Sequence, residues 1–254
     1  MLRRLCLSLV LCLWLPTLAL AEGQRWVAFG DSLTASQNWP WTELLEKATG
    51  NTVINSGLNR STTRASLAFL DKDVIQHHPD LVLVMFGVND QRIPNGGTVD
   101  GYQVPPDEYE KNLEQMVQRI QAAGAKVVLM TNRPLIQGPA RPHGSLYLDR
   151  QGDGGKLYSL PGQTKGSIRL YNDIVRRVAA RNEAYLVDIW QAVVDRAGSD
   201  SDEDVLTVGL ERPGKWLDGV HLGPDGARFY NRTILDAMPF TPRGPRTTGR
   251  EITP

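Results

Sequence analysis

The sequence predicts a single α/β domain, a three-layer α/β/α sandwich in which helices cover both faces of a parallel β-sheet. Short apolar runs alternate along the chain with longer segments of helical periodicity, and strands separated by helices are typical of parallel sheets. One run, Leu81–Phe86, consists of six apolar residues in succession, which indicates a strand covered on both faces. The hydrophobic content of 41% suffices for a sizeable core and excludes a disordered chain.

Each predicted element has a local justification. The strands are the short apolar runs at Trp26–Phe29, Thr52–Asn55, Leu81–Phe86, Lys126–Met130 and Ala184–Ile189. The helices are the longer segments of helical pattern at Trp41–Ala48, Thr63–His77, Asp107–Ala123, Ile168–Arg181 and Gly223–Met238. Gly50 and Gly124 end two of these helices, and Pro106 and Pro224 can begin two others.

Two polar segments are predicted to lie outside these elements. Asn132–Lys165 is long and rich in glycine and proline, and we expect it to form an insertion over one end of the sheet. The acidic run Asp200–Asp204 is expected to be a solvated loop.

The first 21 residues are typical of a secretory signal peptide. Two arginines precede an apolar run, and residues 19–21 (Ala-Leu-Ala) fit the small-residue pattern of a cleavage site. We expect cleavage after Ala21, a folded domain over residues 22–238 and a flexible tail over residues 239–254. Such a leader directs the protein to the periplasm or to the outside of the cell. An uncleaved anchor is the alternative.

Charge and cysteine content narrow the functional classes. The 28 Lys and Arg residues balance 28 Asp and Glu residues, so no net positive charge favours nucleic-acid binding. Beyond the leader, no apolar run is long enough for an integral membrane span. Both cysteines, Cys6 and Cys12, lie in the leader, so the mature chain has no disulfide, thiol nucleophile or cysteine-bound metal. Cys12 follows Leu11, where a lipoprotein signal would carry Gly or Ala, which argues against a lipid anchor.

Polar residues follow several predicted strands at the point where the apolar run stops. Residues 30–32 follow the first strand, residues 55–61 the second and residues 87–90 the third, while Asp218 and His221 precede the last helix. In open parallel sheets the carboxyl ends of the strands carry the binding site. These residues supply a hydroxyl, amide donors, an imidazole and a carboxylate, the set needed for acyl transfer through a covalent intermediate.

The combination resembles the SGNH hydrolases, also called GDSL esterases and lipases. Residues 29–34 (Phe-Gly-Asp-Ser-Leu-Thr) match the nucleophile block of that family, residues 87–90 (Gly-Val-Asn-Asp) its Gly-x-Asn-Asp block, and residues 218–221 (Asp-Gly-Val-His) its Asp-x-x-His block. The likeness covers nearly the whole mature chain. It implies a flavodoxin-like parallel sheet and a serine hydrolase that needs no metal and no cofactor.

The residue types indicate how such a site would work. Ser32 would attack an acyl carbonyl, and it needs a base within hydrogen-bond reach because a serine hydroxyl is a poor nucleophile. His221 is the candidate base, since an imidazole can take and return a proton near neutral pH. Asp218 would accept a hydrogen bond from the other ring nitrogen, which fixes the tautomer and stabilises the imidazolium.

The resemblance also implies an oxyanion hole. Its donors would be the backbone N–H of Ser32, the side-chain amide of Asn89 and a backbone N–H from the loop after the second strand. In the family a glycine usually supplies the third donor, whereas Arg60 occupies that position here. We assign the donor to the Arg60 N–H. We favour a side chain directed to solvent, and a side chain at the rim of the acyl or leaving-group pocket is the alternative. Gly57 is the alternative donor, and we expect it to serve the turn itself.

The sequence thus predicts an exported serine esterase whose partners are small-molecule, glycan or lipid esters, with no nucleic acid. The polar, glycine-rich character of Asn132–Lys165 favours short acyl or acetyl groups over a long apolar acyl tunnel. Lysophospholipase or thioesterase activity and acyl transfer by the same serine are the alternatives. A non-enzymatic binding module is disfavoured because every catalytic block is present.

Overall fold

The computed structural model describes residues 23–92, 102–136, 163–210 and 220–238. One sheet of five parallel strands lies at its centre, in the order β2-β1-β3-β4-β5, which confirms the predicted flavodoxin-like α/β fold. The strands are β1 (Arg25–Gly30), β2 (Thr52–Gly57), β3 (Leu81–Met85), β4 (Lys126–Met130) and β5 (Tyr185–Val187).

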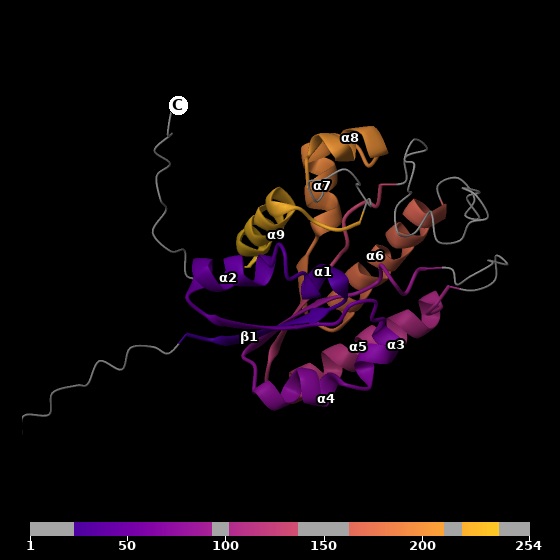
Figure 1. The fold of residues 1–254 in the computed structure, drawn as a ribbon. Coiled ribbons are helices and arrows are strands. Elements are labelled where there is room, and N and C mark those ends of the chain that lie inside the picture. The colour runs from indigo at the N-terminus through magenta and orange to yellow at the C-terminus, as the bar shows by residue number, and fades with distance from the viewer. Residues whose placement is uncertain (1–22, 93–101, 137–162, 211–219, 239–254) are drawn as a thin grey trace, which may run out of the picture.

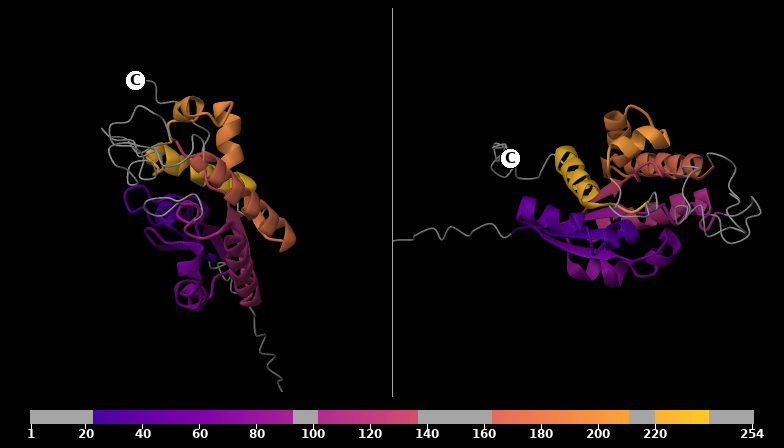
Figure 2. Two further views of the ribbon diagram at one scale, coloured as in Figure 1. Left: turned by 90° about the vertical axis from the view of Figure 1, so that its right-hand side faces the viewer. Right: turned by 45° about the horizontal axis from the view of Figure 1, so that its top comes forward.

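Helices cover both faces of this sheet, as Figures 1 and 2 show. Against one face lie α3 (Thr63–Leu67), α4 (Leu70–Asp73), the 3₁₀ turn η1 (Ile75–His77), α5 (Pro106–Ala122) and α6 (Gln163–Arg181). Against the other face lie α1 (Ser32–Ala35), α2 (Trp41–Thr49), α7 (Ile189–Ala197), α8 (Asp202–Thr207) and α9 (Pro224–Ala237). No helix of the described ranges is both long and apolar enough to cross a membrane.

The central strands are buried on both faces because their side chains alternate between two hydrophobic clusters. In β1, Trp26 and Ala28 pack into the cluster beneath α2 and α9, whereas Val27 and Phe29 pack into the cluster against α5 and α6. All four are at most 2% exposed. Burial of one such large apolar side chain stabilises the fold by about 1.5–3 kcal/mol. The apolar runs in the sequence therefore mark strands that are covered on both sides.

The prediction of one continuous helix over residues 63–77 is wrong. The segment 63–77 forms α3, α4 and η1 instead of a single helix. The chain leaves the helical conformation at Phe69 (φ −106°, ψ 5°) and again at Val74 (φ −130°, ψ −64°). These breaks accompany complete burial of both Leu70 and Val74 in the cluster under the sheet. Tertiary packing thus overrides the helical pattern of the sequence.

The predicted insertion is shorter than expected, and residues 137–162 of it lie outside the described ranges. Residues 132–136 are buried at the end of β4, and α6 already begins at Gln163. The acidic run is also not wholly a loop, because α8 begins at Asp202. The Ser201 hydroxyl accepts a hydrogen bond from the Asp204 N–H at 3.1 Å, which satisfies a backbone donor in the first turn.

Helix α7 is absent from the sequence prediction. Strand β5 ends at Val187 rather than at Ile189 as predicted, and the helix begins at Ile189. Asp188 caps it, since its side chain accepts a hydrogen bond from the Gln191 N–H at 3.1 Å. Gly198 ends it with φ 92°, in the left-handed region that glycine adopts readily.

Candidate active site

The strand order places a binding site at the carboxyl ends of β1 and β3. The chain first passes from β1 to β2 on one side and then crosses to β3 on the other side of β1. Ligands of such sheets bind at this switch point. Ser32 follows β1 and begins the short helix α1, whose first turn is capped by the side chain of Asp31. Asn89 lies in the turn after β3. Both side chains that the sequence analysis selected at these strands therefore lie at the switch point.

His221 lies beside Ser32, although 189 residues separate them. The Nε2 atom of His221 is 3.1 Å from the Oγ atom of Ser32, within the range of a nucleophile and its base. Gly223 is the N-terminal cap of α9, so the histidine lies two residues before this cap. Asp218 lies outside the described residues, and its contact with His221 stays a prediction.

The proposed oxyanion donors come from neighbouring loops. The Nδ2 atom of Asn89 donates to the carbonyl oxygen of Ser61 at 2.9 Å, which joins the loop after β3 to the loop after β2. Arg60 precedes Ser61 and has φ 63°. This conformation is easy for glycine and uncommon for other residues, so the glycine that the family resemblance implies at this position would adopt it without strain. The Arg60 side chain is exposed, as expected.

Gly57 has a different role from the one expected. It is the last residue of β2 and belongs to no turn. Its N–H donates to Oδ1 of Asn55 at 3.0 Å, so this donor already has a partner. A Cβ atom at Gly57 would lie 2.3 Å from the backbone nitrogen of Ala35, so glycine here permits close approach of α1 to the strand.

Two buried carboxylates, which the sequence analysis gave no role, support the site. Oδ1 of Asp90 accepts from the Thr63 N–H at 2.8 Å and from the Thr63 hydroxyl at 2.6 Å, and Oδ2 accepts from the Gly87 N–H at 3.2 Å. Burial raises the pKa of Asp90 to about 6, although these hydrogen bonds oppose the rise. Asp90 thereby ties the loop after β3 to the first turn of α3.

Asp31 is the second buried carboxylate, directly before the nucleophile. Its Oδ1 accepts from the Leu33 N–H at 2.9 Å, while its Oδ2 has no hydrogen-bond partner in the described part of the chain. Burial raises the pKa of Asp31 to about 7; the Leu33 bond lowers it, the charge of Asp90 raises it and His221 lowers it. The Asp31 carboxyl therefore changes from its neutral to its charged form near neutral pH, where burial of the charge lowers the stability of the fold.

Asp31→Asn is expected to stabilise the protein at pH 8 and to change its stability little at pH 4. The pKa of Asp31 rises from 3.8 to about 7 on folding, so the folded state binds more protons between these pH values. The wild type therefore loses stability as the pH rises through this window. Asparagine keeps an oxygen for the Leu33 N–H and carries no charge. The variant therefore avoids a loss in the free energy of unfolding of at most about 4 kcal/mol.

Urea unfolding of both proteins between pH 4 and pH 8 measures this difference. Asp236→Asn, which removes an exposed carboxylate from α9, is the matched control and should follow the wild-type curve. Parallel pH profiles for wild type and Asp31→Asn would contradict the assignment.

Arg133 is a further residue that sequence reasoning missed, because nothing in the segment 132–165 marks it as buried. Its side chain is fully buried at the end of β4. Nη2 donates to the carbonyl oxygen of Val220 at 3.1 Å, and Nη1 donates to that of Pro134 at 3.2 Å. Val220 immediately precedes His221, so the guanidinium fixes the backbone that carries the histidine.

Arg133→Met is expected to slow labelling of Ser32 by a fluorophosphonate about 10- to 100-fold, because small displacements of catalytic groups carry such costs. Methionine fills the buried space but cannot donate to the Val220 carbonyl. Arg119→Met is the control. The Arg119 guanidinium, on α5, also donates to a backbone carbonyl, that of Leu67 at 3.3 Å. Thermal unfolding of each variant separates loss of positioning from loss of fold. Wild-type labelling rates in a folded Arg133→Met protein would exclude the positioning role.

The strand order and the contact between Ser32 and His221 define a hydrolase of the SGNH fold. The model of the GDSL-like lipase/acylhydrolase family matches residues 28–229, and the chain belongs to this family. Carboxylic ester hydrolysis is accordingly its class of activity.

The chain is similar to two curated relatives and shares its fold with a solved structure. The uncharacterized lipoprotein YqeF of Bacillus subtilis is 30% identical over 245 residues, which are 91% of this chain and 97% of that protein. An arylesterase of Vibrio mimicus is 35% identical over 142 residues, 52% of this chain and 65% of the relative. The structure of an acetylxylan esterase from Geobacillus stearothermophilus shares the fold with a TM-score of 0.63 at 21% identity, covering 86% of this chain and 95% of the other.

Proposed function

We propose that this protein is an exported serine esterase that removes short acyl or acetyl groups through Ser32, His221 and Asp218. The observation that carries the proposal is the distance of 3.1 Å between Nε2 of His221 and Oγ of Ser32. A serine hydroxyl becomes a nucleophile when a base at this distance takes its proton. Export rests on the signal-like leader over residues 1–21, with the folded hydrolase domain over residues 22–238 and a tail over residues 239–254.

The first half of the reaction acylates the serine. Oγ of Ser32 attacks the ester carbonyl while Nε2 of His221 takes the hydroxyl proton, and Asp218 accepts from Nδ1 to stabilise the imidazolium. Negative charge develops on the former carbonyl oxygen. The N–H groups of Ser32 and Arg60 and the amide of Asn89 would donate to it. His221 then returns the proton to the leaving alcohol, which departs.

The second half releases the acid. A water molecule takes the position of the alcohol, His221 removes its proton, and the resulting attack on the acyl-serine repeats the same charge development. Collapse of this second intermediate returns the proton to Ser32. An alcohol acceptor in place of water would give acyl transfer by the same route, so partition of the product between acid and new ester measures that alternative.

The short-acyl preference has two supports. The 132–165 segment is polar and glycine-rich, and its first residues, 132–136, fill buried space at the end of β4. Relatives and structural neighbours include an arylesterase and an acetylxylan esterase. We therefore place acetylated carbohydrates and short-chain aryl esters ahead of lysophospholipids and thioesters as substrates.

Covalent labelling combined with a substrate series tests the proposal. The wild-type protein is expected to react once with a fluorophosphonate, and peptide mass mapping should place the adduct on Ser32. Acetyl, butyryl, octanoyl and palmitoyl aryl esters, assayed beside acetylated sugars, should show kcat/KM falling with chain length. An unlabelled Ser32 would overturn the mechanism, and a preference for palmitoyl esters would overturn only the substrate assignment.

A further inference from the structure

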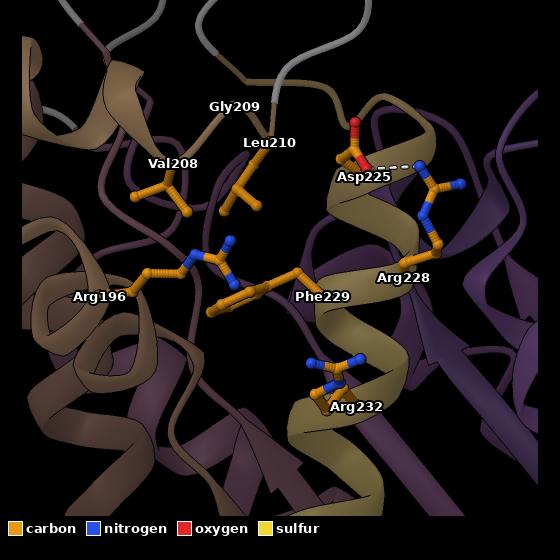
Figure 3. A pocket seen from close by; sticks show the side chains of 8 residues that line it. All are labelled: Arg196, Val208, Gly209, Leu210, Asp225, Arg228, Phe229 and Arg232. Atoms are coloured by element: carbon orange, nitrogen blue, oxygen red, sulfur yellow. Dashed lines mark hydrogen bonds and ion pairs between the residues drawn. The ribbon is translucent and has the colours of Figure 1, made fainter. Parts of the chain in front are cut away.

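A hollow lies against α9, between this helix and the segments at the ends of α7 and α8 (Figure 3). Its volume is about 280 Å³, close to the lower end of the range of small-ligand pockets, about 300–1,000 Å³. The described residues that line it include neither Ser32 nor His221. The pocket is therefore a separate feature from the catalytic pair.

The pocket carries an excess of positive charge. Arg196, Arg228 and Arg232 line it together with one carboxylate, Asp225. Asp225 forms an ion pair with Arg228, which Figure 3 shows as a dashed line. Within the described residues, neither Arg196 nor Arg232 has an acidic partner. Among the carboxylates that the structure describes, none is therefore paired with either of these two guanidinium groups.

The arrangement of these charges favours an anion. Arg228 and Arg232 are four residues apart on one helix, so they share a face and repel each other. Arg196 reaches across from α7, and its guanidinium carbon lies 5.8 Å from the centroid of the Phe229 ring (Figure 3). Contact with the ring favours this position of the cation. A bound anion would relieve the repulsion.

The floor of the pocket is apolar and firmly held. Val208 and Leu210 are 9% and 1% exposed, and Phe229 contributes its partly buried ring. The Leu210 carbonyl accepts from the Gly223 N–H at 2.8 Å. A Cβ atom at Gly226 would lie 2.3 Å from the same carbonyl oxygen, so α9 packs directly on this backbone. The floor exists before any ligand arrives, which lowers the cost of binding.

We infer that this pocket binds a small phosphate monoester. A phosphate monoester carries a charge of about −1.5 to −2 near neutral pH, which matches two guanidinium groups better than a single carboxylate does. Guanidinium groups bind phosphate oxygens through paired, charge-assisted hydrogen bonds. The organic part of the ligand would lie on Val208, Leu210 and Phe229. The same phosphate chemistry occurs in soluble compounds and in lipid headgroups.

Titration calorimetry of the full chain with phenyl phosphate, at constant ionic strength, tests the inference. The double variant Arg196→Gln/Arg232→Gln is expected to bind at least about 10-fold more weakly, since each hydrogen bond to a charged group carries at least such a factor. The double variant Lys47→Gln/Lys72→Gln removes the same charge from exposed positions on α2 and α4 and should bind like the wild type. Equal affinity in all three proteins would overturn the inference, as would benzoate binding as tightly as phenyl phosphate.

Sedimentation with phosphatidylcholine vesicles that contain phosphatidic acid distinguishes the two phosphate sources. Co-sedimentation that only the arginine variant loses would support the pocket with a lipid phosphate as its ligand, and phenyl phosphate binding without co-sedimentation would support it with a soluble one. Hydrolysis of acetyl esters by the arginine variant should stay at the wild-type rate. Failure of this inference is therefore distinguishable from failure of the proposed esterase mechanism.

Discussion

Ser32→Ala is expected to lower kcat/KM for acetyl esters by about 10⁴- to 10⁶-fold. The variant lacks the hydroxyl oxygen that we propose as the nucleophile, and the proposed oxyanion donors that remain can give only weak residual catalysis. Stability should change little, because Ser32 is partly exposed and its hydroxyl contacts the imidazole of His221. Steady-state kinetics with thermal unfolding of both proteins measures the two quantities.

The matched control for this variant is Ser36→Ala, which removes a hydroxyl from the end of the same short helix. Its kcat/KM should equal that of the wild type. A Ser32→Ala protein that retains more than about a hundredth of wild-type activity while folded would exclude the covalent mechanism, since a nucleophile contributes far more than this factor.

Asn89→Ala is expected to lower kcat by about 10²- to 10³-fold and to leave KM nearly unchanged. The amide of Asn89 would donate to an oxyanion that exists only after attack, so its loss affects the transition state more than the bound substrate. The variant also loses the hydrogen bond to Ser61, which lowers stability by about 1 kcal/mol. Full kinetic curves for a soluble acetyl ester separate kcat from KM.

Asn112→Ala controls for the structural part of this change. Asn112 is also buried, and its Nδ2 donates to the Thr63 hydroxyl at 3.2 Å on α3. It should show a similar loss of stability with kcat near the wild-type value. If both asparagine variants reduce kcat equally, the effect of Asn89 is structural and another group must stabilise the oxyanion.

Much of the fold was predictable because its strands are buried on both faces and therefore appear as apolar runs. Lys126–Met130 was predicted with the observed bounds for this reason. The helical segment 63–77 was not, because its breaks at Phe69 and Val74 depend on contacts with the sheet rather than on local propensity. The start of α7 depends on the cap formed by Asp188, a residue placed inside the predicted fifth strand.

The candidate site residues also form two groups, those that the sequence indicates and those that only the structure reveals. The positions of the candidates Ser32, Asn89 and His221 were predictable, because each is a reactive or donating group at the end of an apolar run or before a helix; their catalytic roles stay predictions. Arg133 was not predictable, because only packing shows that its guanidinium is buried against the carbonyl of Val220. The pKa of Asp31 likewise follows from its burial, which the local sequence does not reveal.

By itself, the sequence determined the order of the five strands along the chain and the chemical groups available at the strand ends, since both follow from local residue type and spacing. Only the tertiary structure decided which groups meet and which lose contact with water. The contact of Ser32 with His221 across 189 residues, the raised pKa of Asp31 and the arginine-lined pocket beside α9 all have this origin. Proximity and desolvation arise when distant segments pack together, and no local pattern encodes them.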